Sequence, residues 1–195
     1  MKQRILSSGI VVLFLAAGSA SAGIGIFSDP AGSDCNLTLP NSVPTLVYVL
    51  YMGEGGPQAT GAEYSIAGMP GTFGVTFTAD LINAPGSNLN IGNPFDGTAH
   101  AVGWPTPQPF DLNGNLLVAT WIVTNVGAPI PPGTILTVTG RPLYYEPPCW
   151  GSPLVNDAEF ELICQEGGEM IINGGPSCTV AVEERTWTEV RSLYR

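Results

Sequence analysis

Short apolar runs separated by turn-forming residues leave this chain little choice of architecture. Gly and Pro account for 25 and 18 of the 195 residues, so few apolar runs extend far before a turn signal. Ala62, Tyr64 and Ile66 alternate with polar neighbours, and residues 134–140 show the same period of two. This alternation is typical of half-buried β-strands. The sequence therefore predicts an all-β fold, a single antiparallel β-sandwich over residues 23–183.

The same signals place about eight to ten strands along the chain. Residues 46–52 are apolar on both faces, which predicts a strand buried on both sides. Residues 104–110 (WPTPQPF) contain three prolines and predict a stiff loop instead. The predicted strands cover residues 23–28, 41–53, 62–66, 73–78, 116–124, 134–140, 158–164, 170–173 and 178–183.

The charge composition excludes several classes of protein. Only 11% of residues are charged, and 16 acidic against 6 basic residues give a net charge of −10. A nucleic-acid binder needs clustered Lys and Arg to neutralise phosphates, so this class is excluded. A hydrophobic content of 44% is enough for a core, which argues against a wholly disordered chain.

The N-terminus has the three parts of a secretory signal peptide. Lys2 and Arg4 form a positive start, residues 5–17 are mostly apolar, and Ala20-Ser-Ala22 offers small residues to a signal peptidase. The apolar run is too short to span a bilayer, which takes roughly 20 residues. We therefore expect residues 1–22 to be cleaved and the protein to be secreted, to the periplasm, the cell surface or the medium. No later run predicts a membrane span.

The cysteines are Cys35, Cys149, Cys164 and Cys178. An even number in an exported chain predicts two disulfides. A zinc site is the alternative, but zinc sites use closely spaced pairs, and the shortest spacing here is 14 residues. Alternation directs Cys164 and Cys178 inward from neighbouring predicted strands. This favours Cys164–Cys178 with Cys35–Cys149 among the three pairings that four cysteines allow.

Residues suited to catalysis are few. His100 is the single histidine, no G-x-S-x-G elbow is present, and bridged cysteines supply no thiolate. Glu159 and Glu161 share one face of a predicted strand, whereas glycosidases place their carboxylates on separate elements across a cleft. We therefore expect solvated glutamates, no cofactor and no enzymatic activity.

One segment has the spacing of calcium-binding oxygens. Asp111-Leu-Asn-Gly-Asn115 resembles the start of a calcium loop, but Leu116 and Ile122 stand where that loop needs Gly and Glu. Asn113-Gly114 between apolar runs is a hairpin signal. A turn is therefore favoured, calcium remains the weaker alternative, and no metal site is predicted. A second, equally weak oxygen cluster consists of Asn90, Asn93 and Asp96.

Aromatic residues offer one candidate ligand surface. A flat exposed row of rings on a sandwich could stack on sugars, and the candidates are Trp104, Tyr144, Tyr145 and Trp150. The alternative for these rings is packing in loops or over a disulfide. Trp121 lies within an apolar run and is expected in the core.

Residues 184–195 differ from the rest of the chain. The capping box TWTE (186–189) is followed by apolar residues at helical spacing, with Trp187, Val190 and Tyr194 on one face. This predicts a short amphipathic helix that docks through that face, on the sandwich or on a partner. Its basic residues are Arg185, Arg191 and Arg195.

Three segments resemble a set of uncharacterised secreted bacterial proteins. They are the tail CTVAVEERTWTEVRSLYR (178–195), the segment GAEYSIAGMPG (61–71) and INGG before Cys178. The resemblance implies export and a sandwich fold, and it implies no chemistry. More faintly, the order of strands and Gly-rich turns is similar to that of cohesin-type and carbohydrate-binding sandwiches.

Two hypotheses for function follow from these features. The first is a secreted, non-enzymatic structural or interaction protein with a protein partner. The alternative is a carbohydrate-binding module that presents the aromatic platform to an extracellular glycan.

Overall fold

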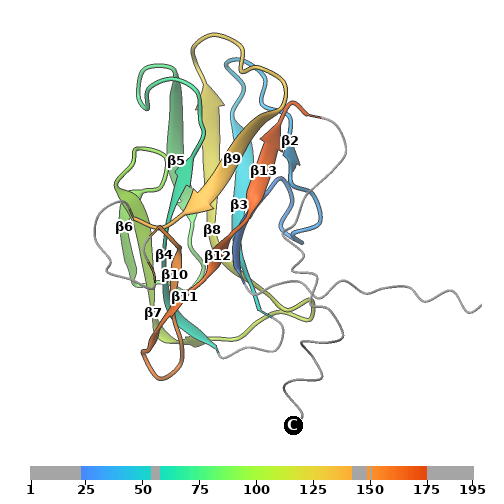
Figure 1. Cartoon of the computed structure of the whole chain (residues 1–195). Coiled ribbons are helices and arrows are strands. Elements are labelled where there is room, and N and C mark those ends of the chain that lie inside the picture. Colours follow the sequence, from blue (N-terminus) through green and yellow to red (C-terminus); the bar gives the residue numbers. More distant parts are fainter. Residues whose placement is uncertain (1–22, 54–57, 142–148, 150, 175–195) are drawn as a thin grey trace, which may run out of the picture.

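The computed structural model describes residues 23–53, 58–141, 149 and 151–174. These residues form an all-β sandwich of two mainly antiparallel sheets, which confirms the predicted fold class (Figure 1). The predicted signal peptide (1–22) and C-terminal helix (184–195) lie outside the described residues and stay predictions. Among the residues described, no helix is long and apolar enough to cross a membrane.

The first sheet has five strands in the order β12-β1-β3-β8-β5. All its pairings are antiparallel except the short parallel pairing of β1 with β12. The strand bounds are β1 Gly23–Phe27, β3 Thr45–Met52, β5 Phe77–Asn83, β8 Asn115–Asn125 and β12 Glu166–Gly167.

The second sheet has eight strands and divides around its central strand β4. The first half of β4 pairs with β7 on one side and β10 on the other, and its second half pairs with β9. The order β11-β10-β4-β9-β13-β2 forms the path, with β6 attached to β7. The bounds are β2 Asn36–Leu37, β4 Ala59–Ala67, β6 Leu89–Asn93, β7 Ala99–Gln108, β9 Thr134–Thr139, β10 Leu154–Asn156, β11 Leu162–Cys164 and β13 Glu169–Ile172.

The core lies between the two sheets and follows the alternation read from the sequence. Tyr64 and Ile66 of β4 and Leu136 and Val138 of β9 face inward and are buried, as predicted. Trp121 of β8 is also buried, which confirms its expected place in the core. Alternation identifies these positions because one face of each strand packs on the opposite sheet.

Three polar side chains form a hydrogen-bonded cluster inside this core. The Trp121 Nε1–H donates to the Tyr64 hydroxyl (2.9 Å), which lies 3.0 Å from His100 Nδ1. His100 is fully buried, and its Nε2 has no hydrogen-bond partner. Burial lowers the pKa of His100 to about 4 and raises that of Tyr64, although the Trp121 hydrogen bond opposes the latter. His100 is therefore neutral in the folded protein at pH 7.

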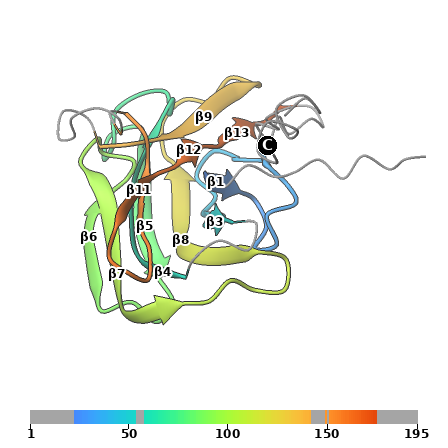
Figure 2. The same ribbon diagram turned by 60° about the horizontal axis from the view of Figure 1, so that its bottom comes forward.

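One edge of the sandwich is closed by a segment that changes sheets. β12 pairs with β1 of the first sheet, and β13, which begins after one intervening residue, pairs with β9 of the second (Figure 2). On its other side β13 pairs with β2. At the change, Gly168 N–H donates to the Ile24 carbonyl, and its own carbonyl accepts from Val138 N–H, both at 2.9 Å. A Cβ on Gly167 would lie 1.8 Å from the Val138 carbonyl oxygen. We call residues 166–168 with these contacts the seam.

Three sequence predictions about strands are wrong. Residues 74–76 form a turn that leaves Val75 70% exposed, because Gly74 has a positive φ of 75°. Most of the predicted strand 158–164 is a hairpin turn, closed by two backbone N–H groups on Asp157 Oδ1. The Pro-rich stretch 104–110 belongs largely to β7, where a register shift accommodates it.

Residues 46–52 are predicted to form a strand buried on both faces, and this holds for only part of β3. Leu50 and Tyr51, adjacent residues that point to opposite faces, are both buried. Leu46, near the start of the strand, is 42% exposed. The strand is therefore covered on both faces only toward its C-terminal end.

Candidate functional site

A groove crosses the outer face of the second sheet, over strands β6, β7, β4, β10 and β11. These strands lie side by side at the lower left of Figure 1. Large residues such as Val102 and Tyr64 face the core, so the alternate residues of the same strands face outward. On β4 and β7 those outward residues are unusually small. The groove is the space that they leave.

The floor of the groove consists of two facing pairs of residues. Gly61 of β4 lies opposite Gly103 of β7, and Glu63 lies opposite Ala101. A Cβ on Gly103 would approach the Leu89 Cβ to 3.3 Å, and one on Gly61 would lie 3.1 Å from the Val102 carbonyl oxygen. The floor therefore has almost no side-chain bulk except for Glu63.

Apolar side chains form the two ridges. Leu89 and Ile91 of β6 are 46% and 60% exposed, and Leu162 of β11 on the other side is 60% exposed. The space between Leu89 and Leu162 has a volume of about 210 Å³, and an adjoining space of about 120 Å³ reaches Ile91 and Arg141. Both spaces are lined by Glu63 and Ala101, so they form one groove.

Two buried oxygen atoms in the groove have no hydrogen-bond partner. They are Glu63 Oε1, on the floor, and Asn156 Oδ1, on the β10 side. A buried acceptor without a donor costs about 1–3 kcal/mol, and more for a charged group. Because both atoms are buried, hydrogen-bond donors on a molecule in the groove can satisfy them once the two side chains turn toward it.

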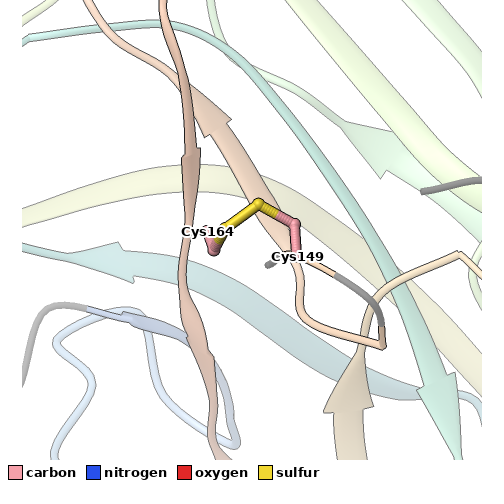
Figure 3. Close-up of a disulfide and its surroundings, with 2 residues drawn as sticks. All are labelled: Cys149 and Cys164. Atoms are coloured by element: carbon pink, nitrogen blue, oxygen red, sulfur yellow. A yellow bond between two sulfur atoms is a disulfide. The ribbon is translucent and has the colours of Figure 1, made fainter. Parts of the chain in front are cut away.

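A disulfide supports the β10–β11 side of the groove. Cys149 and Cys164 are bonded, with their Cα atoms 5.2 Å apart (Figure 3). Cys164 lies directly opposite Leu154 of β10 and shares the face of Leu162, because residues two apart on a strand point the same way. The bond therefore ties the segment before β10 to β11, beside the groove.

This pairing contradicts the predicted Cys164–Cys178 and Cys35–Cys149. The prediction directed Cys164 inward, but Leu162, which shares its face of the strand, is 60% exposed. The hairpin β10–β11 instead brings Cys149 to Cys164. Cys35, which is buried, is also disulfide-bonded. Cys178 lies outside the described residues.

The aromatic platform loses its first member in the structure. Trp104 is only 5% exposed, and its Nε1–H donates to the Pro85 carbonyl at 2.8 Å. It faces inward because it falls in phase with Val102 on β7. Packing, the alternative that the sequence left open for these rings, therefore holds for Trp104, which adds no ring to an exposed platform. The other proposed sugar-binding residues, Tyr144, Tyr145 and Trp150, and the docking residues Trp187, Val190 and Tyr194 lie outside the described residues.

The two oxygen clusters considered for calcium are occupied by backbone contacts. Asp111 Oδ1 accepts from the N–H groups of Asn113 and Asn115, which is how an aspartate closes a tight turn. The favoured turn is therefore confirmed. Asn93 Oδ1 and Asp96 Oδ1 accept from backbone N–H groups in the same manner. Within the described part of the chain, no three His, Cys, Asp or Glu side chains are arranged to hold a metal ion.

The groove was missed by the sequence analysis, although its signal is present. In residues 99–104 (AHAVGW) the positions out of phase with His100, Val102 and Trp104 are all Ala or Gly. A sheet face open to solvent usually carries larger β-forming residues. Small residues at every second position of β7, opposite Gly61 of β4, therefore indicate a hollow, but only once the pairing of the two strands is known.

Comparison with known proteins gives similarity of fold alone. No protein-family model matches the chain, and no curated protein matches it. A cohesin module from a Clostridium perfringens family 33 glycoside hydrolase is 9% identical, with a TM-score of 0.49 over 80% of this chain and 100% of that one. The sixth cohesin of Acetivibrio cellulolyticus scaffoldin B, solved with a dockerin, is 12% identical, with a TM-score of 0.46 over 80% and 99%. A type III cohesin from a cell-surface anchoring scaffoldin of Ruminococcus flavefaciens is also 12% identical, with a TM-score of 0.42 over 88% and 97%.

Proposed function

We propose that this protein is a secreted, non-enzymatic interaction protein that binds a polypeptide segment in the groove. The observation that carries the proposal is the groove itself, with exposed Leu89, Ile91 and Leu162 around a floor of Gly and Ala. Exposed apolar side chains that border a hollow are typical of binding surfaces. Glu63 Oε1 and Asn156 Oδ1 add acceptors that a polypeptide can satisfy with N–H groups.

The position of His100 supports a non-enzymatic role. The single histidine of the chain is sealed in the core and is held neutral, out of reach of any substrate. The described residues that line the groove include no Ser, Cys or His and no second carboxylate. The hydroxyls of Thr60 and Thr98, which also line it, donate to the Asp157 carbonyl and to Asp96 Oδ1. The chemistry of the lining residues suits hydrogen bonding and not proton transfer.

Two features support secretion. The disulfide Cys149–Cys164 is of the kind that persists in oxidising compartments. Residues 1–22 have the layout of a signal peptide. A polypeptide is favoured over a glycan because the groove is lined by aliphatic and small residues, whereas sugar sites rely on exposed rings.

Capture from the surface extract and culture supernatant of the producing organism tests this function. The immobilised protein is compared with Ala101→Trp, which fills the floor, and with Glu63→Lys, which reverses the charge there. Leu112→Trp is the control, because Leu112 is 105% exposed on the distant Asp111–Asn115 turn. We expect the same protein to be captured by the wild type and the control and to be lost with both groove variants.

Capture that is equal for all four proteins would overturn the proposal, as would binding of a glycan on an array that Ala101→Trp abolishes. Because Ala101 is on the outer face, we expect Ala101→Trp to unfold with a cooperative transition like that of the wild type. That measurement separates loss of binding from loss of folding.

A further inference from the structure

We infer that the groove is the docking site of the chain's own C-terminal segment, residues 185–195, which a partner must displace. The inference rests on the groove being the binding site proposed above. It goes further because it names an occupant and makes that occupant a regulator of access.

Charge complementarity favours this segment. The described residues contain eleven Asp and Glu, and Arg141 is the only Lys or Arg among them. Residues 185–195 contain Arg185, Arg191 and Arg195 with a single glutamate. Most of the positive charge of the chain after residue 22 is therefore concentrated in eleven residues. Glu63 lies on the floor of the groove, and Arg141 lines its smaller space.

Hydrogen-bond chemistry points the same way. The groove offers two acceptors, Glu63 Oε1 and Asn156 Oδ1, that have no donor. Arginine carries five N–H donors and can bind a carboxylate with two of them at once. Trp187 and Tyr194 carry further donors on large apolar rings. The segment thus offers donors together with apolar surface, and the groove offers acceptors between Leu89 and Leu162.

The dimensions of the groove suit a short helix. Its ridges lie on β6 and β11, four strand spacings apart, which corresponds to about 19 Å. A helix with its side chains is about 10–12 Å wide, and the helix predicted within this segment would be roughly 13 Å long. Trp187, Val190 and Tyr194 lie on one face at helical spacing and would rest on the small residues of the floor.

The segment can also reach the groove. The described chain stops at Gly174, whose carbonyl accepts from the Asn36 side chain beside β13. From there Glu63 on the floor of the groove lies about 30 Å away along the strand direction of β9 and β4 and two strand spacings, about 10 Å, across, a straight distance of roughly 32 Å. The connecting residues 175–184 can span roughly 33 Å when extended.

Site-specific photo-crosslinking in the full-length chain tests the inference. p-Benzoylphenylalanine replaces Leu162 on the ridge in one protein and Leu112, the distant exposed residue, in the control. We expect irradiation at position 162 to yield peptides that contain residues 185–195, and position 112 to yield at least tenfold fewer. A second reporter at Leu89 covers the opposite ridge. Crosslinks from both ridges to other segments only, or equal yields at positions 162 and 112, would overturn the inference.

The charge contribution is measured in the same assay. Glu63→Gln should lower the crosslink yield at position 162 several-fold, and raised salt should lower it in the wild type and less in the variant. No effect of either change would contradict pairing of an arginine with Glu63. A mixture of ¹⁴N- and ¹⁵N-labelled chains shows whether the segment comes from the same molecule or a neighbour. Crosslinks within one molecule are expected, and crosslinks only between molecules would overturn the inference.

Deletion of residues 185–195 separates this inference from the proposed function. If both are right, the shortened protein captures its partner more strongly than the full chain does. If crosslinks to the segment are absent while capture still depends on Ala101 and Glu63, the inference alone is wrong. If the segment crosslinks to the groove but the groove variants capture the partner as well as the wild type does, the proposed function is wrong.

Discussion

The seam and the groove both depend on missing side chains, but with opposite results. At the seam, Gly167 and Gly168 let three strands approach so closely that a Cβ on Gly167 would lie 1.8 Å from a carbonyl oxygen. In the groove, Gly61, Gly103 and Ala101 leave a hollow of about 210 Å³ open to solvent. The comparison shows that small residues in a sandwich can close an edge or open a surface. Whether small residues close an edge or open a surface depends on the atoms that lie opposite them.

The largest expected effect is at the seam. Gly167→Ala places a methyl group inside the van der Waals radius of the Val138 carbonyl, and two backbone segments must separate to admit it. We expect a loss of more than about 4 kcal/mol in the free energy of unfolding, or no folding at all. Urea denaturation followed by tryptophan fluorescence measures it.

Gly133→Ala is the matched control for this change. Nothing lies within 4 Å of its Cβ position, but φ is +78°, so only backbone strain opposes the substitution. We expect a cost of about 1 kcal/mol. Equal costs for the two variants would mean that the seam is not the tight junction described here.

The second prediction concerns the support of the groove. Replacing Cys149 and Cys164 with serine removes a cross-link between residues separated by 15 positions. The chain-entropy model gives a loss of roughly 3 kcal/mol. We also expect hydrogen exchange to quicken in β10 and β11 and to change little at β12 and β13, since the cross-link lies on the groove side. Uniform acceleration in all four strands would contradict this local role.

The third prediction tests the core that both regions share. Because burial lowers the pKa of His100 to about 4, the unfolded state binds a proton more readily below pH 6.5 than the folded state does. The contribution of neutral His100 to the free energy of unfolding is fully present above pH 6.5 and is lost as the pH falls toward 4. We expect a loss of about 2 kcal/mol between pH 7.5 and 5. Denaturation at both pH values measures it.

His100→Asn is the control for the pH effect. Asparagine keeps an acceptor near the Tyr64 hydroxyl and cannot take up a proton. The variant is expected to be less stable at every pH because it loses ring contacts with Tyr64 and Trp121. Its stability should nevertheless change by about 2 kcal/mol less than that of the wild type over this pH range, and an unchanged pH dependence would rule out His100 as the cause.

Sequence alone predicts the strands whose two faces differ most. Tyr64 with Ile66 and Leu136 with Val138 are found because their neighbours are polar and the core covers one face only. The same rule fails for Leu162, which is apolar yet 60% exposed as a ridge of the groove. In the sequence, an apolar residue that serves binding cannot be told from an apolar residue of the core. The wrong prediction for this strand therefore falls at the candidate site.

The disulfide and β7 were beyond sequence reasoning for a different reason. Pairing of Cys149 with Cys164 depends on the β10–β11 hairpin, which is formed by strands of only three residues each. Residues 104–108 of β7 contain two prolines, which lack the N–H that a ladder needs. The sheet tolerates these prolines because the pairing of β7 with β4 is interrupted there. Gly103 lies opposite Gly61, and the next paired residue of β7 is Gln108, opposite Ala59. Local patterns cannot show such long-range pairings.

The smallest expected effect on stability is in the groove, at Ala101→Thr. Position 101 is half-buried on the outer face, opposite Glu63, and a β-branched residue there suits a strand better than alanine does. We therefore expect unfolding free energy to stay the same or to rise by up to about 1 kcal/mol. Photo-crosslinking from position 162 to residues 185–195 and partner capture should both fall several-fold, because the added methyl and hydroxyl groups fill the floor. A protein that becomes more stable while it binds less would show that the small residues are there for binding. If Ala101→Thr instead destabilises the fold as strongly as the disulfide variant does, the floor of the groove is a tight junction like the seam, and both binding proposals lose their basis.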